Sequence, residues 1–200
     1  IDHAPASQLV FNTQPADPTI AGEDITPVIE IRDAFNNVIT DNDDATADIT
    51  LSLAAGTGTL GGTLTVSAVN GVATFSATQG AYINLIGAKT IAAWKSDESG
   101  GSGVGILSVN SNAFDIIHAP ASKLVFSTQP ANNTVAGTDL TPVIQIRDAF
   151  DNVITDNDDA TADITLSLAD GSGTFGGTLT VSAVAGIATF SATQGANIDL

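Results

Sequence analysis

Two short acidic stretches hold the residues most able to do chemistry. The sequence TDNDDATAD occurs at 40–48 and again, unchanged, at 155–163. Carboxylates this close repel one another, by about 1 to 4 kcal/mol per pair at a partly exposed site. A divalent cation would remove that cost, and Ca²⁺ suits Asp and Asn oxygens better than Zn²⁺ or Mg²⁺ because it tolerates many ligands in flexible geometry. The sequence therefore predicts one calcium site from Asp33, Asp41, Asp43, Asp44 and Asp48, and a second from Asp148, Asp156, Asp158, Asp159 and Asp163.

A second interpretation makes the same stretches solvated acidic loops that discourage edge-to-edge association of strands. They are not EF-hand loops, because they lack the glycine and the final glutamate that such loops need after Asp-x-Asp. Asp97-Glu98, together with Asp115, forms a weaker calcium candidate near the junction of the two repeats. His3 and His118 occupy equivalent linker positions, where a packed or solvated joint residue and a metal or pH role are both open.

The acidic stretches belong to a long internal repeat. Aligning Ile1 with Ile116 gives a register of about 115 residues, in which roughly 68 of the 85 aligned pairs are identical. An enzyme with one active site needs no second copy of its domain. The near-identity of the two repeats therefore favours an array that provides length or several binding sites. We expect a first repeat at 1–117 and a second at 118–200, which is C-terminally incomplete because it lacks counterparts of the strands at 88–96 and 106–116.

Composition excludes several classes of partner. The chain has 5 basic and 22 acidic residues, a net charge of −17, which argues against nucleic acid and anionic membrane surfaces. It has no cysteine, so disulfides, Cys-ligated zinc and cysteine catalysis are excluded together. No apolar run is long enough to insert into a membrane, and any targeting segment is expected outside these 200 residues.

The segments that flank the acidic stretches are predicted to form short strands. In ITPVIEIRDAF (25–35), Ile29 and Ile31 point to one face while Glu30 and Arg32 point to the other, as in a half-buried antiparallel strand. ADITLSLA (47–54) alternates in the same way, and no window has helical periodicity. About seven such strands per repeat, with turn signals every 8 to 12 residues, predict an all-β fold.

A hairpin is expected where Asn70-Gly71 separates the strands at 63–69 and 72–77, because Asn-Gly is a strong signal for a two-residue turn. The second copy has Ala185-Gly186 at this place. Either the glycine alone suffices for the turn, or the turn is not of type I′.

Several motifs together resemble a known family. SKLVFSTQP, VIQIRDAFDNVIT, GTFGGTLTV, NGVATFSA and SNAFDI look like the bacterial immunoglobulin-like repeats of large secreted and surface proteins, in the broad invasin-like group. The resemblance implies tandem immunoglobulin-like β-sandwich domains, strung along adhesins and stalks on the extracellular side of the cell surface. Two positions depart from the pattern. Asn36 and Asp151 stand where relatives often have glycine, and both tolerate the positive φ that the turn needs; Lys89 stands where relatives often have an aromatic residue.

The function expected from these observations is that of a structural extender in a surface adhesin or fibre, whose partners are neighbouring repeats of the same chain and whose loops calcium would stiffen. No enzyme is expected, since the only histidines lie in linkers. One alternative is a glycan- or protein-binding module, with Trp94 and Tyr82 as its few aromatic candidates. Another is a filament protomer: the strands absent from the second repeat either follow in a longer chain or come from other copies by strand addition.

Overall fold

The computed structural model describes residues 3–95 and 107–199. The chain divides into two compact units, Ile1–Ile117 (unit 1) and His118–Leu200 (unit 2). Their regular structure is almost entirely β. Among the described residues the exceptions are two four-residue 3-10 turns, η1 (Asp43–Thr46) and η2 (Asp158–Thr161), one in each acidic stretch. The prediction of an all-β chain is therefore confirmed.

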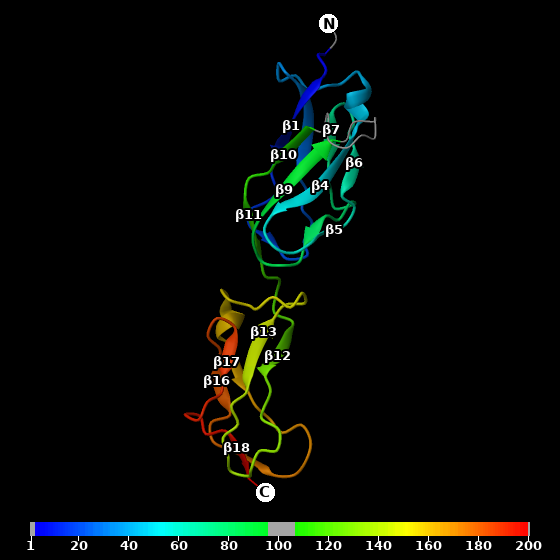
Figure 1. Ribbon diagram of the computed structural model, residues 1–200. Coiled ribbons are helices and arrows are strands. Elements are labelled where there is room, and N and C mark those ends of the chain that lie inside the picture. Colours follow the sequence, from blue (N-terminus) through cyan, green and yellow to red (C-terminus); the bar gives the residue numbers. More distant parts are fainter. Residues whose placement is uncertain (1–2, 96–106, 200) are drawn as a thin grey trace. The chain divides into compact units, whose positions relative to one another are not determined.

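Unit 1 is built from two main sheets (Figure 1). The smaller sheet has the order β1-β3-β7, from β1 (Ala6–Thr13), β3 (Val28–Asp33) and β7 (Val72–Thr74). The larger has the order β2-β11-β9-β4-β6, with β10 also paired to β9; its strands are β2 (Thr19–Ile20), β4 (Asp48–Ala55), β6 (Thr65–Ser67), β9 (Gly87–Lys95), β10 (Leu107–Asn110) and β11 (Phe114–Ile117). A separate short pair consists of β5 (Leu60–Gly61) and β8 (Tyr82–Ile83).

The described part of unit 1 thus has more strands than the seven expected. Three of them, β2, β5 and β8, are only two residues long, and such short pairings leave no alternation to read. The segment at 106–116 is also divided, because β10 pairs with one part of β9 and β11 with another.

One apolar core takes side chains from both sheets of unit 1. In β3, Ile29 and Ile31 are fully buried, while Glu30 and Arg32 on the opposite face are only half-buried. Ile49 of β4 is fully buried in the same cluster. The period-two alternation of the sequence therefore identified the buried face correctly.

The turn at Asn70-Gly71 is present, but the predicted hairpin is wrong. Val69 and Val72 exchange two backbone hydrogen bonds across the turn, with N···O distances of 2.9 and 3.1 Å. Beyond that bridge the chain separates, because β6 pairs with β4 in the larger sheet and β7 pairs with β3 in the smaller one. The turn therefore carries the chain from one sheet to the other.

Unit 2 repeats part of this arrangement (Figure 1). Its three-stranded sheet has the order β12-β13-β17, from β12 (Lys123–Thr128), β13 (Val143–Arg147) and β17 (Ile187–Thr189). Two further pairs are β14 (Asp163–Thr165) with β16 (Thr180–Ser182), and β15 (Thr174–Gly176) with β18 (Asn197–Asp199). A separate apolar cluster forms its core.

Strand β4, which pairs with β9 in unit 1, is longer than its counterpart β14 in unit 2. In unit 1, β4 is eight residues long and is paired on both sides, by β9 and by β6. Its counterpart β14 is three residues long and, in the described part of the chain, pairs only with β16. A ladder on one side alone leaves half of the backbone groups of a strand to water.

Candidate functional site

The first predicted ligand in each unit, Asp33 or Asp148, lies inside its own turn. The Oδ1 atom of Asp33 accepts hydrogen bonds from the backbone N–H groups of Phe35 and Asn37, both at 2.9 Å, and Oδ2 accepts one from the Asn37 side chain at 3.0 Å. The Asn37 side-chain bond is the main reason why the pKa of Asp33 lies below its ordinary value. The carboxylate thereby holds the loop that follows β3.

The second unit keeps the same turn. Asp148 is fully buried and accepts bonds from the backbone of Phe150 and from both the backbone and the side chain of Asn152, at 2.8 to 2.9 Å. It also accepts a bond at 3.0 Å from the backbone N–H of Ala119. At the equivalent turn positions of the two units, Asn36 and Asp151 have φ of 69° and 70°. The expectation that this turn tolerates them is confirmed.

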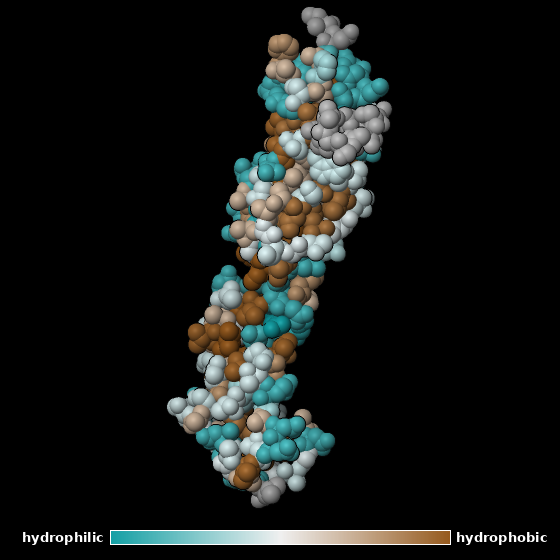
Figure 2. All heavy atoms as spheres, viewed as in Figure 1, coloured by the Kyte–Doolittle hydropathy of each residue, from teal (hydrophilic) through white to brown (hydrophobic). Residues whose placement is uncertain are grey.

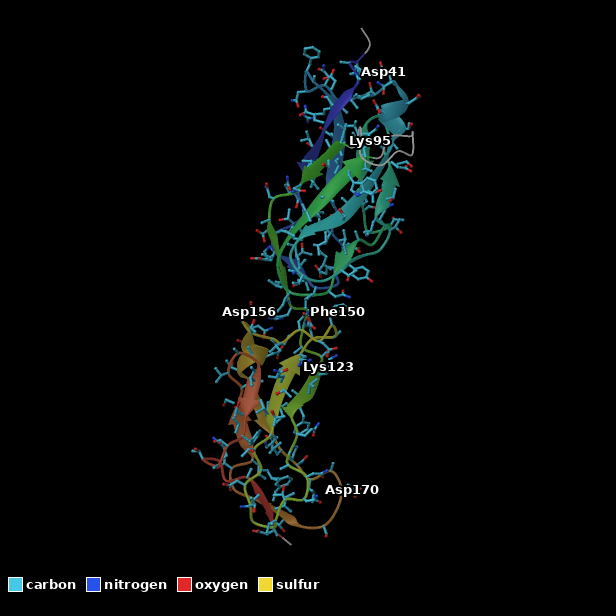
Figure 3. The ribbon with its side chains drawn as sticks, in the orientation of Figure 1. Asp41, Lys95, Lys123, Phe150, Asp156 and Asp170 are labelled. Carbon is cyan, nitrogen blue, oxygen red and sulfur yellow. The ribbon has the colours of Figure 1, made fainter. Side chains whose placement is uncertain are left out.

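Three carboxylates of the first acidic stretch contact three different partners. Asp41 bonds the Nδ1 atom of His3 at 2.8 Å, and Asp44 forms an ion pair with the Nζ atom of Lys95 at 2.8 Å. Asp48 accepts a bond from the Ser67 hydroxyl at 2.6 Å. Figure 3 shows Asp41 and Lys95 near the same end of unit 1. The stretch therefore links the N-terminal segment, η1 and the end of β9.

Capping by asparagine explains the shape of both acidic stretches. In unit 1 the Asn42 side chain accepts a bond from the Asp44 backbone N–H at 2.9 Å, and in unit 2 Asn157 accepts one from Ala160 at 3.2 Å. Asp43 and Asp158 follow directly, in the first turn of each 3-10 segment. Negative side chains are favoured there because the free N–H groups of a turn start carry partial positive charge.

In unit 2 the corresponding side chains are only partly engaged. Asp156 bonds His118, and Asp163 accepts a bond from Ser182 at 2.5 Å. Asp158 and Asp159 contact no cation within the described residues. Among residues 3–95 and 107–199, no group of three or more carboxylates and imidazoles is arranged to hold a metal ion. The carboxylates act on their local partners, and calcium binding stays a prediction of the sequence.

His118 is held between two acceptors. Its Nδ1 atom contacts the carbonyl oxygen of Ala119 at 3.0 Å, and its Nε2 atom contacts the carboxylate of Asp156. A carbonyl and a carboxylate both only accept, so the two contacts are both hydrogen bonds only while both ring nitrogens carry protons. Burial lowers the pKa of His118, but the bonds to Ala119 and Asp156 outweigh it and leave the pKa above its ordinary value.

The sequence patterns did not reveal this histidine–aspartate contact, because its partners lie far apart in the chain. The two histidines each lie 38 residues before their aspartate, in both copies. Figure 3 shows Asp156 at the end of unit 2 that also holds Phe150, with Asp170 at the opposite end. His3 and His118 therefore each contact the acidic stretch that follows them in the sequence.

Lys89, in β9, is buried at 2% exposure. Its Nζ atom donates to the carbonyl oxygen of Ile86 at 3.0 Å. Burial lowers its pKa, and the charge of Asp115 opposes that shift. The stem of Lys89 is thus buried with its strand, while its ammonium group bonds a backbone carbonyl.

The aromatic candidates for ligand binding lie on different strands. Trp94 is half-buried in β9, and Tyr82 lies in β8. The ring of Tyr82 covers its cross-strand partner Gly61, where an added Cβ would lie 2.6 Å from the ring. This close packing gives Tyr82 a structural role. The weaker calcium candidate at Asp97-Glu98 lies outside the described residues.

Comparison with models of protein families and with characterised proteins finds no match to this chain. In the described residues, no helix has the length and apolar character needed to cross a membrane.

Proposed function

We propose that this chain is part of a tandem array of immunoglobulin-like β-sandwich units that acts as an extracellular spacer in a bacterial surface adhesin or fibre. The observation that carries the proposal is the near-identical repeat, in which each copy has its own apolar core. Units that each fold around their own core can be repeated without changing their neighbours. Adding units therefore lengthens the array.

The arrangement of unit 1 supports a sandwich. One core cluster draws on Ile29 and Ile31 from the smaller sheet and on Ile49 and Ile91 from the larger sheet. Sheets that share a core in this way pack face to face, with their polar faces outward. A net charge of −17 keeps such an array soluble and discourages lateral association.

The connectivity of unit 1 also suits a module under tension. β2 and β11 pair in parallel, with Ile116 opposite Thr19, and the Ala21 N–H donates to the Ile117 carbonyl at 2.8 Å. Because β2 lies near the N-terminal end of the unit and β11 at its C-terminal end, pulling the two ends apart loads this pairing in shear. In shear the bonds must break together, which resists force better than breaking them one at a time.

Single-molecule force spectroscopy of the whole chain tests the spacer function. Unit 1 should unfold in one discrete event that releases on the order of 400 Å of chain, at about 3.5 Å per residue. Ala21→Pro, which removes the N–H bonded to Ile117, should lower the force of that event. The matched control is Ala136→Pro, at the equivalent exposed position of unit 2. Gradual extension without a discrete event would contradict a load-bearing role.

A further inference from the structure

Asn70 differs from every other asparagine of the chain in the residue that follows it. It alone precedes a glycine. The side-chain amide of an asparagine is open to attack by the backbone nitrogen of the next residue, and glycine leaves that nitrogen unhindered because it carries no Cβ. Among the asparagines, Asn70 therefore has the most accessible internal nucleophile, the nitrogen of Gly71.

The side chain of Asn70 is also unrestrained. It is exposed and makes no hydrogen bond within the described residues. Other asparagines in the turns of unit 1 are held in place. The side chain of Asn36 accepts a bond from Arg32 at 2.8 Å, and that of Asn42 accepts one from the Asp44 backbone N–H at 2.9 Å. The Asn70 amide is free to rotate toward the nitrogen of the next residue.

The turn that contains Asn70 lies at the surface of unit 1. The preceding residue, Val69, is 70% exposed, and the equivalent Val184 of unit 2 is 76% exposed. Figure 2 shows apolar residues at the surface of both units. Water therefore reaches this turn, as hydrolysis of a cyclic intermediate requires.

The folded turn restrains the nitrogen that would attack. The Gly71 N–H donates to the Ala45 carbonyl at 2.9 Å, and Val69 and Val72 exchange two backbone bonds across the turn. A Cβ at Gly71 would lie 2.1 Å from the carbonyl oxygen of Ile39, so the backbone is closely packed there. The attacking nitrogen must lose its proton, and its bond to Ala45 must open first. Reaction therefore proceeds from molecules in which the turn is transiently open.

We propose that Asn70 is a site of spontaneous deamidation, with water as the only co-reactant. The Gly71 nitrogen gives its proton to solvent and forms a bond to Cγ of Asn70. The bond from Cγ to Nδ2 breaks, and the amide nitrogen leaves as ammonia. Water then opens the cyclic succinimide at one of its two carbonyl carbons. One opening leaves aspartate, and the other leaves isoaspartate, in which the main chain runs through the former side chain.

The two products should affect unit 1 differently. Aspartate tolerates positive φ as asparagine does, so the turn keeps its form and gains a negative charge beside η1, to which it is bonded through Ala45. Isoaspartate adds a methylene group to the main chain. A tight two-residue turn then no longer matches the spacing of the two bonds between Val69 and Val72. The isoaspartate form is therefore the less stable one.

Unit 2 has the same turn without the reactive side chain. Ala185 stands at the equivalent position, also with positive φ, and the Gly186 N–H donates to the Ala160 carbonyl at 2.8 Å. The backbones match and the side chain differs, so deamidation at this turn is confined to unit 1. The proposal depends on the turn and not on the spacer function, so the two can fail independently.

The test incubates the whole chain in mildly alkaline buffer and follows each asparagine by peptide mapping with mass spectrometry. A synthetic peptide of residues 63–77 is the unfolded reference. We expect conversion at Asn70 to be at least about tenfold slower in the chain than in the peptide, because opening the turn breaks three backbone hydrogen bonds. It should still be faster than at Asn12, which is exposed but precedes the β-branched Thr13. Equal rates in chain and peptide, or no conversion at Asn70 while the peptide converts, would overturn the proposal.

Ala185→Asn supplies the matched gain of a site, because it places an asparagine before Gly186 in a turn with the same backbone bonds. We expect deamidation there at a rate comparable to that at Asn70, and its absence would overturn the proposal. Asn70→Asp reproduces one product without the other. In tryptophan fluorescence, which reports on unit 1 through Trp94, the isoaspartate fraction of the incubated chain should unfold at a lower temperature than Asn70→Asp. Equal midpoints would refute the assigned effect of the longer main chain.

Discussion

The turn between β16 and β17 carries a backbone cost that its counterpart in unit 1 avoids. Ala185 has a φ of 47° and Gly186 one of 74°; the equivalent Asn70 and Gly71 have φ of 50° and 75°. Positive φ at both central residues is what a type I′ turn requires. The sequence left open whether the turn at Ala185-Gly186 is of type I′. It keeps that form, because Ala185 adopts the left-handed conformation.

The size of this cost follows from the residue type. The left-handed region costs an ordinary L-residue roughly 1 to 2 kcal/mol, whereas asparagine enters it readily. Ala185 is exposed and contributes no buried side chain. Ala185→Asn should therefore stabilise unit 2 by about 1 kcal/mol, which raises the unfolding midpoint of a unit of this size by about 4 to 8 °C.

Calorimetry of the whole chain measures the predicted shift, and tryptophan fluorescence assigns it to a unit. Trp94 is the single tryptophan of the chain and lies in β9, so its fluorescence reports on unit 1. Ala185→Asn should leave the fluorescence transition unchanged while the calorimetric transition of unit 2 moves upward. The reciprocal change, Asn70→Ala, should lower the fluorescence transition.

Gly186→Ala provides the check that the turn is formed. A Cβ at Gly186 would lie 2.1 Å from the carbonyl oxygen of Ile154, so this change should destabilise unit 2 by more than Ala185→Asn stabilises it. If Gly186→Ala is harmful but neither Ala185→Asn nor Asn70→Ala changes stability, the reasoning from left-handed backbone is wrong.

Three further predictions concern the acidic loops. Because the pKa of His118 is raised in the fold, its contribution to stability is complete below the ordinary value of 6.5 and is lost as the pH rises through the folded-state value. The free energy of unfolding of unit 2 should therefore fall over that pH range, and His118→Gln should make this fall smaller. Identical pH profiles of stability for the two proteins would refute the assignment. Lys95→Met leaves Asp44 without its cation and should cost unit 1 about 1 to 2 kcal/mol by tryptophan fluorescence, while the exposed Lys123→Met should cost under about 0.5 kcal/mol in unit 2 by calorimetry. Calcium binding would stabilise each unit by about 2.7 kcal/mol at 100 times the dissociation constant, and so raise its calorimetric midpoint in millimolar Ca²⁺ relative to EGTA and to Mg²⁺. Asp43→Asn with Asp44→Asn should abolish the rise for unit 1 and leave that of unit 2; equal midpoints with and without Ca²⁺ would count against both sites.

Much of the local structure follows from the sequence alone. The alternation in 28–33 identifies the buried face of β3, because successive side chains of a strand point to opposite sides whatever they pack against. The turns at Asn36 and Asn70 follow from backbone preferences that act within a few residues. The repeat and the all-β character follow in the same way, since they need only composition and order.

Pairing between distant segments was decided by the tertiary structure. The turn at Asn70-Gly71 connects two sheets, because β4 and β3 offer β6 and β7 better partners than these strands offer each other. Among the predicted calcium ligands, three carboxylates contact His3, Lys95 and Ser67, one each. Those partners lie far from the acidic stretch in the sequence, so no local pattern could reveal them.

The equivalent strands β1 and β12 show the same division. Leu9 and Leu124 stand in nearly identical sequences, yet one is buried and the other is exposed. Sequence determines which side chains are apolar and which face they share. Burial depends on whether another strand covers that face, as β9 and β10 do in unit 1.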